Sequence, residues 1–340
     1  MPMSIKVAGL AAALSAATLT GGIWATRSGE AERAAREAMA PTGAPVIVVG
    51  HRGTVKHAPE NTLAAHDAAI ARGATLIEMD VRMTKDGEWV LMHDPIVNRT
   101  TNGGGLVSQM TLSEIKALDA GSWFAAEFAG ERVPTLREAL RNIKGRAAVD
   151  IDFKSGPADS AARLAALLDE EGFDEGPLVT VFARSWHYDK LRSLPSRYVL
   201  RPHYQNARWA DAAVARDGVR VMGLRKRDFS FIAAYDIAER GVALFANTMG
   251  KSDNAEGYAT SLRAGARFIQ TDDLEGLVAY LDERGLRQTC VPAPDLSCWG
   301  KDAAGGRYAA IAGAKPARMA ASVSGGVSNS ASAGIAFGSR

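Results

Sequence analysis

Residues 50–94 read GHRGTVKHAPENTLAAHDAAIARGATLIEMDVRMTKDGEWVLMHD, and this stretch decides the fold. The all-apolar run at residues 46–49 places His51 just beyond the end of a strand, and residues 61–72 show a helical pattern that ends before Gly73. A second strand pattern begins at residue 74. Strand, helix and strand within about 35 residues make a βαβ unit, which predicts a parallel sheet covered by helices.

The second strand is predicted at residues 74–82, ATLIEMDVR. From residue 77 onward, apolar and charged side chains alternate strictly. Successive side chains of a strand point to opposite faces of the sheet. Glu78 and Asp80 are therefore expected to point to the same side, one pleat apart, with apolar residues on the opposite face.

An Asp86-Gly87 pair follows this strand and is a strong hairpin signal, because Asp-Gly readily adopts the positive φ that a tight turn needs. A two-residue turn here would set Lys85 opposite Glu88 and, counting outward, Asp80 opposite His93. Directly opposed residues have Cβ atoms roughly 5 Å apart. The turn is thus predicted to bring His93 to the carboxylate pair. A half-exposed hairpin with ordinary surface charges is the alternative.

Strand and helix patterns continue to alternate along the rest of the chain. Further extended runs lie at residues 147–154, 178–182, 198–200, 219–223, 242–246 and 268–271. With the hairpin's return strand set aside, eight strand units remain, most followed directly by a helix. They predict an α/β fold, a (β/α)8 TIM barrel with a small insertion after the second barrel strand at about residues 95–133. A doubly wound open sheet is the alternative.

The two ends of the chain differ from this pattern. Residues 1–25 are typical of a cleaved signal peptide, with an uncleaved anchor as the alternative, and predict export to the periplasm or the exterior. Residues 26–44 are predicted to be a linker, residues 45–288 the barrel, and residues 289–340 a low-complexity, disordered tail. Cys290 and Cys298 could form a small disulfide loop or remain unpaired.

Composition excludes several functions for this 340-residue chain. A net charge of +2, without a basic cluster interleaved with aromatic residues, argues against nucleic-acid binding. There is no G-x-S-x-G nucleophile elbow. The sequence at Gly250 resembles the end of a phosphate-binding loop, but Phe245 occupies the position of its required first glycine.

Charged side chains collect where barrel strands are predicted to end. They are His51, Glu78, Asp80, Asp152 and Lys154, and the hairpin adds His93. Three carboxylates without a sulfur ligand suit one hard divalent cation, Ca²⁺ or Mg²⁺. With Arg52 and Lys154 such a site keeps one positive charge, which a phosphodiester would neutralise. Both histidines then remain free for proton transfer, and Asp150 is expected to be structural.

The motifs GHRG, APENT, IEMDV, TKDG and VLMHD, in this order and spacing, resemble those of the glycerophosphodiester phosphodiesterase family. The resemblance extends over about residues 46–286 and includes VPTLREAL, LFANT and QTDDL. It implies a (β/α)8 barrel and metal-dependent hydrolysis of a glycerophosphodiester to glycerol 3-phosphate and an alcohol. The implied roles are acid and base catalysis for His51 and His93, metal binding for Glu78, Asp80 and Asp152, and phosphate binding for Arg52 and Lys154.

The chain departs from the family pattern in places. Asp152 stands where the family usually has glutamate, so this shorter side chain is expected to reach the metal through water. Phe245 replaces a common tryptophan, and ARSWH at residues 183–187 matches a Ser-Phe strand end poorly. These last changes fall where the glycerol or alcohol group is expected to bind.

Two other functions remain as alternatives. A lysophospholipase D or sphingomyelinase-D-like enzyme would act on larger lipids, and a wide apolar mouth formed by Trp123, Phe124 and Trp186 would favour it. A non-catalytic barrel would only bind glycerophosphate groups. The expected partner is a small glycerophosphodiester, with no nucleic acid and no membrane span in the mature chain.

Overall fold

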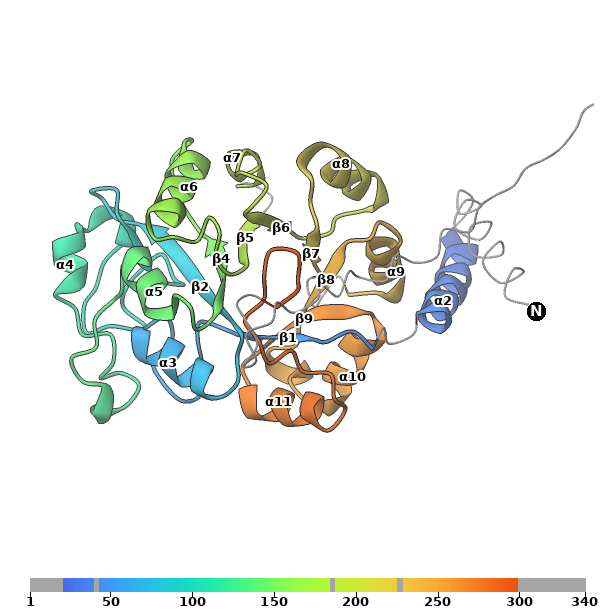
Figure 1. Cartoon of the computed structure of the whole chain (residues 1–340), viewed down its shortest axis with the longest axis horizontal. Helices are drawn as coiled ribbons and strands as arrows, with labels where there is room; N and C mark the ends of the chain where they lie inside the picture. Colours follow the sequence, from blue (N-terminus) through green and yellow to red (C-terminus); the bar gives the residue numbers. More distant parts are fainter. Residues whose placement is uncertain (1–20, 40–42, 184–186, 225–228, 299–340) are drawn as a thin grey trace, which may run out of the picture.

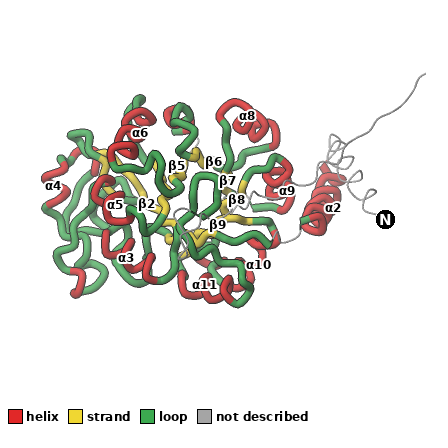
Figure 2. The backbone as a smooth tube through the Cα atoms, viewed as in Figure 1, coloured by secondary structure: helices red, strands yellow, loops and turns green. Residues whose placement is uncertain are grey.

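Parallel strands form a nearly closed barrel at the centre of the molecule, and helices surround it (Figures 1 and 2). The computed structural model describes residues 21–39, 43–183, 187–224 and 229–298. Within these ranges the barrel has eight parallel strands. They are β1 (Ile47–Gly50), β2 (Leu76–Met83), β4 (Ala148–Phe153), β5 (Val179–Ala183), β6 (Val199–Pro202), β7 (Val221–Gly223), β8 (Ala243–Asn247) and β9 (Ala266–Thr271).

The strand order confirms the predicted (β/α)8 barrel over an open sheet. Neighbouring strands follow the order β6-β5-β4-β2-β1-β9-β8-β7. The two ends of this row meet at a parallel bridge between His203 and Gly223, where the Tyr204 amide donates a 2.9 Å hydrogen bond to the Gly223 carbonyl. The carboxyl ends of all eight strands therefore open at one mouth.

Helices alternate with the strands on the outside of the barrel. They are α3 (Leu63–Ala71), α5 (Leu136–Ile143), α6 (Ser160–Glu170), α7 (Tyr188–Leu191), α8 (Ala207–Asp217), α9 (Phe231–Glu239), α10 (Ala255–Arg263) and α11 (Leu274–Asp282). Local sequence explains where several begin, because Thr62 caps α3 and Thr135 forms a capping box with Glu138 at α5.

Each barrel strand separates two layers of buried side chains. Alternate residues such as Val49, Leu76 and Phe268 fill the barrel interior. The residues between them, such as Ile77 and Met79, pack outward against the helices. The alternation predicted for β2 is thus confirmed, and Glu78 and Asp80 lie on the interior side with Leu76.

The hairpin after β2 forms, but its predicted register is wrong by one residue. Strand β3 (Trp89–Leu91) pairs with β2 so that Met83 faces Trp89. Thr84 then pairs with Glu88, and the loop has three residues that end in Gly87 at φ +87°. Three-residue hairpins with glycine in the left-handed region are a common alternative to the two-residue turn. Asp80 consequently pairs with Met92 instead of His93.

A small lobe lies between β3 and α5, at the predicted insertion. It contains the short helices η1 (Val107–Gln109), α4 (Leu112–Lys116) and η2 (Ala126–Phe128). Its own apolar cluster includes Val97, Val107 and Ile115, and this cluster continues into Val90 beside the barrel. The lobe is therefore built onto the barrel at the end of β3.

The segments flanking the barrel differ from the predicted linker and tail. Helix α2 (Gly21–Ala38) covers most of the predicted linker, residues 26–44. It packs against α9, and its Ala35 is buried (Figure 1). At the other end, Cys290 and Cys298 form a disulfide, and the Pro292 carbonyl accepts a hydrogen bond from Leu178 at 2.7 Å. The predicted tail begins at residue 289, but the described structure continues to residue 298.

The remaining predictions for the ends fall outside the described residues. Most of the predicted signal peptide, residues 299–340 of the predicted tail, and Trp186 belong to the undescribed ranges. Among the helices that are described, none has both the length and the apolar character needed to cross a bilayer.

Candidate active site

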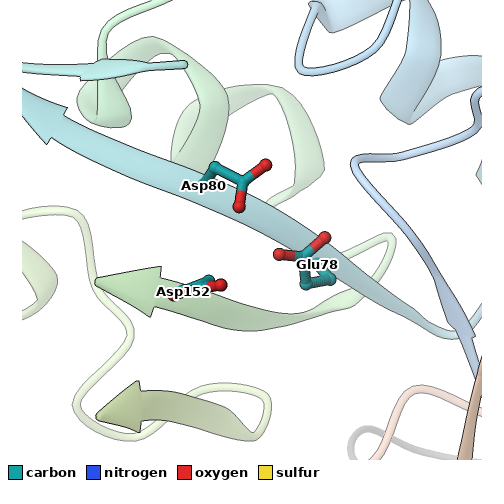
Figure 3. Close-up of side chains that lie close together, drawn as sticks. All are labelled: Glu78, Asp80 and Asp152. Atoms are coloured by element: carbon teal, nitrogen blue, oxygen red, sulfur yellow. The ribbon is translucent and has the colours of Figure 1, made fainter. Parts of the chain in front are cut away.

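Three buried carboxylates from two adjacent strands gather inside the barrel mouth (Figure 3). Glu78 and Asp80 come from β2, and Asp152 comes from β4, where it is the register partner of Asp80. One oxygen from each carboxylate lies within 4.8 Å of the others. The structure thus brings together the three side chains predicted as metal ligands.

Two basic side chains contact this cluster. The Lys154 ammonium lies 2.8 Å from Asp80 Oδ1 and also contacts Asp152 Oδ2. Arg52 Nε lies 3.2 Å from Asp80 Oδ2. The Arg52 amide donates a hydrogen bond to Glu78 Oε2 at 2.8 Å. Both predicted phosphate-binding residues therefore border the carboxylates.

The three acids experience different electrostatic environments. Burial opposes ionisation of Asp80, but Lys154 and Arg52 outweigh it and hold the pKa of Asp80 well below its usual range. Burial and the neighbouring Asp80 and Asp152 raise the pKa of Glu78 well above its ordinary value. A hard cation with oxygen ligands would relieve this repulsion, so the donor set fits Ca²⁺ or Mg²⁺.

Each predicted catalytic histidine is held by a carboxylate. His51 Nδ1 donates to Asp272 Oδ1 at 2.6 Å, and the Asp272 amide donates to Asp253 Oδ2 at 2.7 Å. His93 Nδ1 donates to Asp94 Oδ1 at 2.6 Å. A carboxylate on Nδ1 fixes the ring tautomer and leaves Nε2 as the nitrogen that exchanges a proton.

His93 lies close enough to the acids to interact with them electrostatically. Burial lowers the pKa of His93, although the nearby charge of Asp80 and the hydrogen bond that His93 donates to Asp94 act in the opposite direction. The one-residue change in the hairpin register therefore does not separate this histidine from the site.

Sequence reasoning missed several polar residues that hold the site together. Asn61 Nδ2 donates to Asp80 Oδ2 at 2.9 Å, and its Oδ1 accepts the Asp80 amide. Glu60 accepts a 2.8 Å hydrogen bond from Arg52. Both lie within the APENT motif, and Asp272 lies within QTDDL. The motifs therefore include these residues, but they do not indicate which side chains the residues contact.

Asp150 has a structural environment, as expected. It is fully buried and accepts hydrogen bonds from Arg201 Nε at 2.9 Å and from Thr180. The Arg201 guanidinium lies 3.9 Å from the ring centre of Phe245. Asp150 therefore neutralises a buried arginine within the barrel.

Two positions where the chain departs from the family motif are buried. Phe245 is 2% exposed and stacks on Phe268 inside the barrel. His187 is buried, and its Nε2 donates to the Lys154 carbonyl at 2.9 Å. The expectation that these positions contact the glycerol or alcohol group stays a prediction, and residues 184–186 are not described.

Comparisons with known proteins show which family the chain resembles. Residues 51–221 match the model of the glycerophosphoryl diester phosphodiesterase family. A glycerophosphodiester phosphodiesterase from Caldanaerobacter subterraneus subsp. tengcongensis is 35% identical over 250 residues, which cover 70% of this chain and 99% of that relative.

Solved structures resemble the barrel as a whole. A glycerophosphodiester phosphodiesterase from Agrobacterium tumefaciens is 29% identical, with a TM-score of 0.58 over 69% of this chain and 99% of that one. A phosphodiesterase from Oleispira antarctica, solved with the product sn-glycerol-3-phosphate, is 24% identical, with a TM-score of 0.62 over 70% of this chain and 97% of that one. The second likeness supports the fold alone.

Proposed function

The chain belongs to the glycerophosphoryl diester phosphodiesterase family and is a phosphoric diester hydrolase, and from this premise we propose that it converts glycerophosphodiesters into glycerol 3-phosphate and an alcohol. The observation that carries the proposal is the gathering of Glu78, Asp80 and Asp152 at the barrel mouth, bordered by Arg52 and Lys154. With a divalent cation bound, the three carboxylates and the two basic side chains would leave one positive charge, which suits a ligand with one negative charge.

The proposed cofactor is one divalent cation, Ca²⁺ or Mg²⁺, held by Glu78, Asp80 and Asp152. Support comes from the oxygen-only donor set and from the raised pKa of Glu78, which burial and its acidic neighbours cause. When bound, such a cation would stabilise negative charge on a phosphoryl oxygen.

The chain's own residues supply binding and proton transfer in this proposal. Arg52 and Lys154 would bind the phosphate oxygens, because both present positive charge at the carboxylate cluster. His51 and His93 would move protons through Nε2, one from the attacking water or substrate hydroxyl and the other to the leaving alcohol. Asp272 and Asp94 would keep the two rings in the required tautomer.

An activity screen with controlled metal content tests the proposal. The purified chain, stripped with EDTA and reloaded with Ca²⁺ or Mg²⁺, should release glycerol 3-phosphate from glycerophosphocholine, glycerophosphoethanolamine and glycerophosphoglycerol. Binding without turnover in saturating metal would establish the non-catalytic barrel instead. Phosphorus NMR of early products would show whether a cyclic phosphate forms first.

The lipid-acting alternative has one observation in its favour. The lobe next to His93 exposes Ile96, Leu106 and Trp123, at 44%, 38% and 40% of their surfaces. Choline release from lysophosphatidylcholine as fast as from glycerophosphocholine would overturn the choice of small substrate.

We also propose that the protein acts outside the cytoplasm. The signal-like composition of residues 1–25 motivates this proposal, and the Cys290–Cys298 disulfide supports it, since disulfides persist mainly in oxidising compartments. Detection of the processed chain in a periplasmic or culture fraction would test it, and retention of the full chain in the membrane would favour the uncleaved anchor.

A further inference from the structure

One arginine from the small lobe bridges two carboxylates at the edge of the proposed site. Arg99 Nε donates to Asp94 Oδ2 at 2.6 Å. Its two terminal nitrogens donate to both oxygens of Glu60, at 2.8 and 2.7 Å. Among the described residues, the partners of this guanidinium are thus two acids, Asp94 at the end of the hairpin and Glu60 before α3.

Each of these acids holds a different residue of the proposed machinery. Asp94 uses its other oxygen to accept the hydrogen bond from His93 Nδ1. Glu60 also accepts from the Arg52 guanidinium at 2.8 Å. Arg99 is thus linked through Asp94 to His93, the proposed proton-transfer group. It is linked through Glu60 to Arg52, a proposed phosphate-binding group.

We propose that Arg99 is a positioning residue that fixes both the His93 imidazole, through Asp94, and the Arg52 guanidinium, through Glu60. The proposal rests on the function proposed above and assigns a role to the lobe in the reaction. The planar fork of arginine suits it, because a guanidinium can donate to two carboxylates in fixed directions and an ammonium cannot.

The lobe is built to hold Arg99 in place. Val97 and Gly105 pair through a 3.0 Å backbone hydrogen bond, and Asn98 Oδ1 accepts the Gly105 amide at 3.1 Å. Thr100, which follows Arg99 in the chain, is 6% exposed, and its hydroxyl donates to Met92 Sδ at 3.3 Å. The residues on both sides of Arg99 are therefore held by contacts within the lobe and, through Thr100, by Met92, the neighbour of His93 in the chain.

The lobe packs against the barrel beside Glu60 and His93, which line one small cavity. A cavity of only about 10 Å³ lies among Glu60, His93 and Thr100, together with Val133 of the lobe. The Arg99 hydrogen bond is also the largest influence that lowers the pKa of Asp94, from 3.8 to about 2. Asp94 therefore remains an acceptor for His93 Nδ1 at neutral pH.

A double-mutant cycle tests whether Arg99 acts through its partners. The variants are Arg99→Gln, Asp94→Asn, Glu60→Gln and the pairs Arg99→Gln/Asp94→Asn and Arg99→Gln/Glu60→Gln. We expect Arg99→Gln to lower kcat about tenfold or more and to raise KM a few-fold, because misplaced catalytic groups lose rate steeply. Asp94→Asn should reproduce mainly the loss in kcat, and Glu60→Gln mainly the rise in KM.

Coupling is the decisive result. If Arg99 acts through Asp94, the double variant should have a kcat within about twofold of the worse single variant, since effects within one network do not add. Multiplied losses in both double variants would overturn the proposal, and so would an Arg99→Gln variant with wild-type kinetics. The matched control is Arg197→Gln, an arginine of similar exposure that pairs with Asp169 by three hydrogen bonds on the outside of the barrel.

Nitrogen NMR of the histidine ring separates this proposal from the proposed function. In the wild type, His93 should carry its proton on Nδ1, and Arg99→Gln should shift the ring signals toward a mixture of tautomers. Wild-type protein without turnover would refute the proposed function but leave this measurement valid. Unchanged ring signals in a folded Arg99→Gln variant would refute the positioning role, and Arg99→Lys provides the same test if the glutamine variant does not fold.

Discussion

At the scale of single residues, the site separates groups that bind charge from groups that move protons. The carboxylates of Glu78, Asp80 and Asp152 lie within 4.8 Å of one another, and His93 is not among them. Its Nδ1 is committed to Asp94. Loss of the ring should therefore affect the reaction and leave the acidic cluster unchanged.

Replacing His93 with alanine tests this separation. We expect His93→Ala to lower turnover by about 10²- to 10⁴-fold, the usual contribution of a positioned acid or base. Ca²⁺ or Mg²⁺ affinity, measured by calorimetry, should stay close to that of the wild type. A large loss of metal affinity would instead place His93 among the ligands.

A second residue-scale prediction concerns His66, which is fully buried on α3. Neither ring nitrogen has a hydrogen-bond partner among the described residues, and burial lowers the pKa of His66 to about 4. The unfolded chain would bind a proton near the ordinary value of 6.5. Stability is therefore fully present above pH 6.5 and is lost as the pH falls toward 4.

The expected loss is on the order of 3 kcal/mol, since each pKa unit is worth about 1.4 kcal/mol. Urea unfolding of wild type and His66→Leu at pH 7 and at pH 4.5 measures it. The variant should lose less stability over this interval. Equal losses in both proteins would show that other groups cause the acid sensitivity.

At the scale of elements, Glu32 of the N-terminal helix α2 binds the start of helix α9. Glu32 of α2 accepts hydrogen bonds from the Phe231 and Ile232 amides, at 2.6 and 3.3 Å, at the start of α9. Arg36, one helical turn later, lies 5.6 Å from the ring centre of Phe231. The first amides of a helix have no partner within the helix, so a carboxylate there is stabilising.

Glu32→Ala should accordingly lower the free energy of unfolding by about 1 kcal/mol, the typical value of a helix cap. The matched control is Glu37→Ala on the same helix, because Glu37 is exposed and lies 4.0 Å from Arg33, a pair that contributes little. Urea titrations of both variants measure the difference. An equal effect of the two substitutions would show that α2 does not stabilise α9 through this contact.

At the scale of the whole molecule, the barrel carries an electrostatic cost at its mouth. Pairing of β2 with β4 brings three acids together in a buried site, and Lys154 with Arg52 only partly balances their charge. Binding of a divalent cation to the folded state alone should therefore stabilise the entire domain.

Thermal unfolding in added Ca²⁺ or Mg²⁺ measures this linkage. At a concentration about 100 times Kd the gain is about 2.7 kcal/mol, which corresponds to a rise in Tm of roughly 5–10 °C for a domain of this size. Asp80→Asn should reduce the shift, and a monovalent salt at equal ionic strength should not reproduce it. A full shift in the Asp80→Asn variant would remove Asp80 from the ligand set.

The sequence by itself determined the features that depend on neighbouring residues along the chain. Strand alternation placed Glu78 and Asp80 on the interior face, and capping residues and glycines marked the ends of helices, because backbone geometry and local hydrogen bonds set both. Eight such units were sufficient to predict the barrel. The motifs were sufficient to identify the family, which the comparisons confirm.

Only the tertiary structure decided which residues from distant segments meet. Asp272 holds His51 across 221 residues of chain, and Arg99 joins two acids from different segments, yet neither pairing leaves a periodic trace in the sequence. The hairpin register and the docking of α2 on α9 were also decided there. The physical reason is that periodicity reports which face a side chain occupies, whereas its partner depends on how barrel closure brings separate strand ends and loops together.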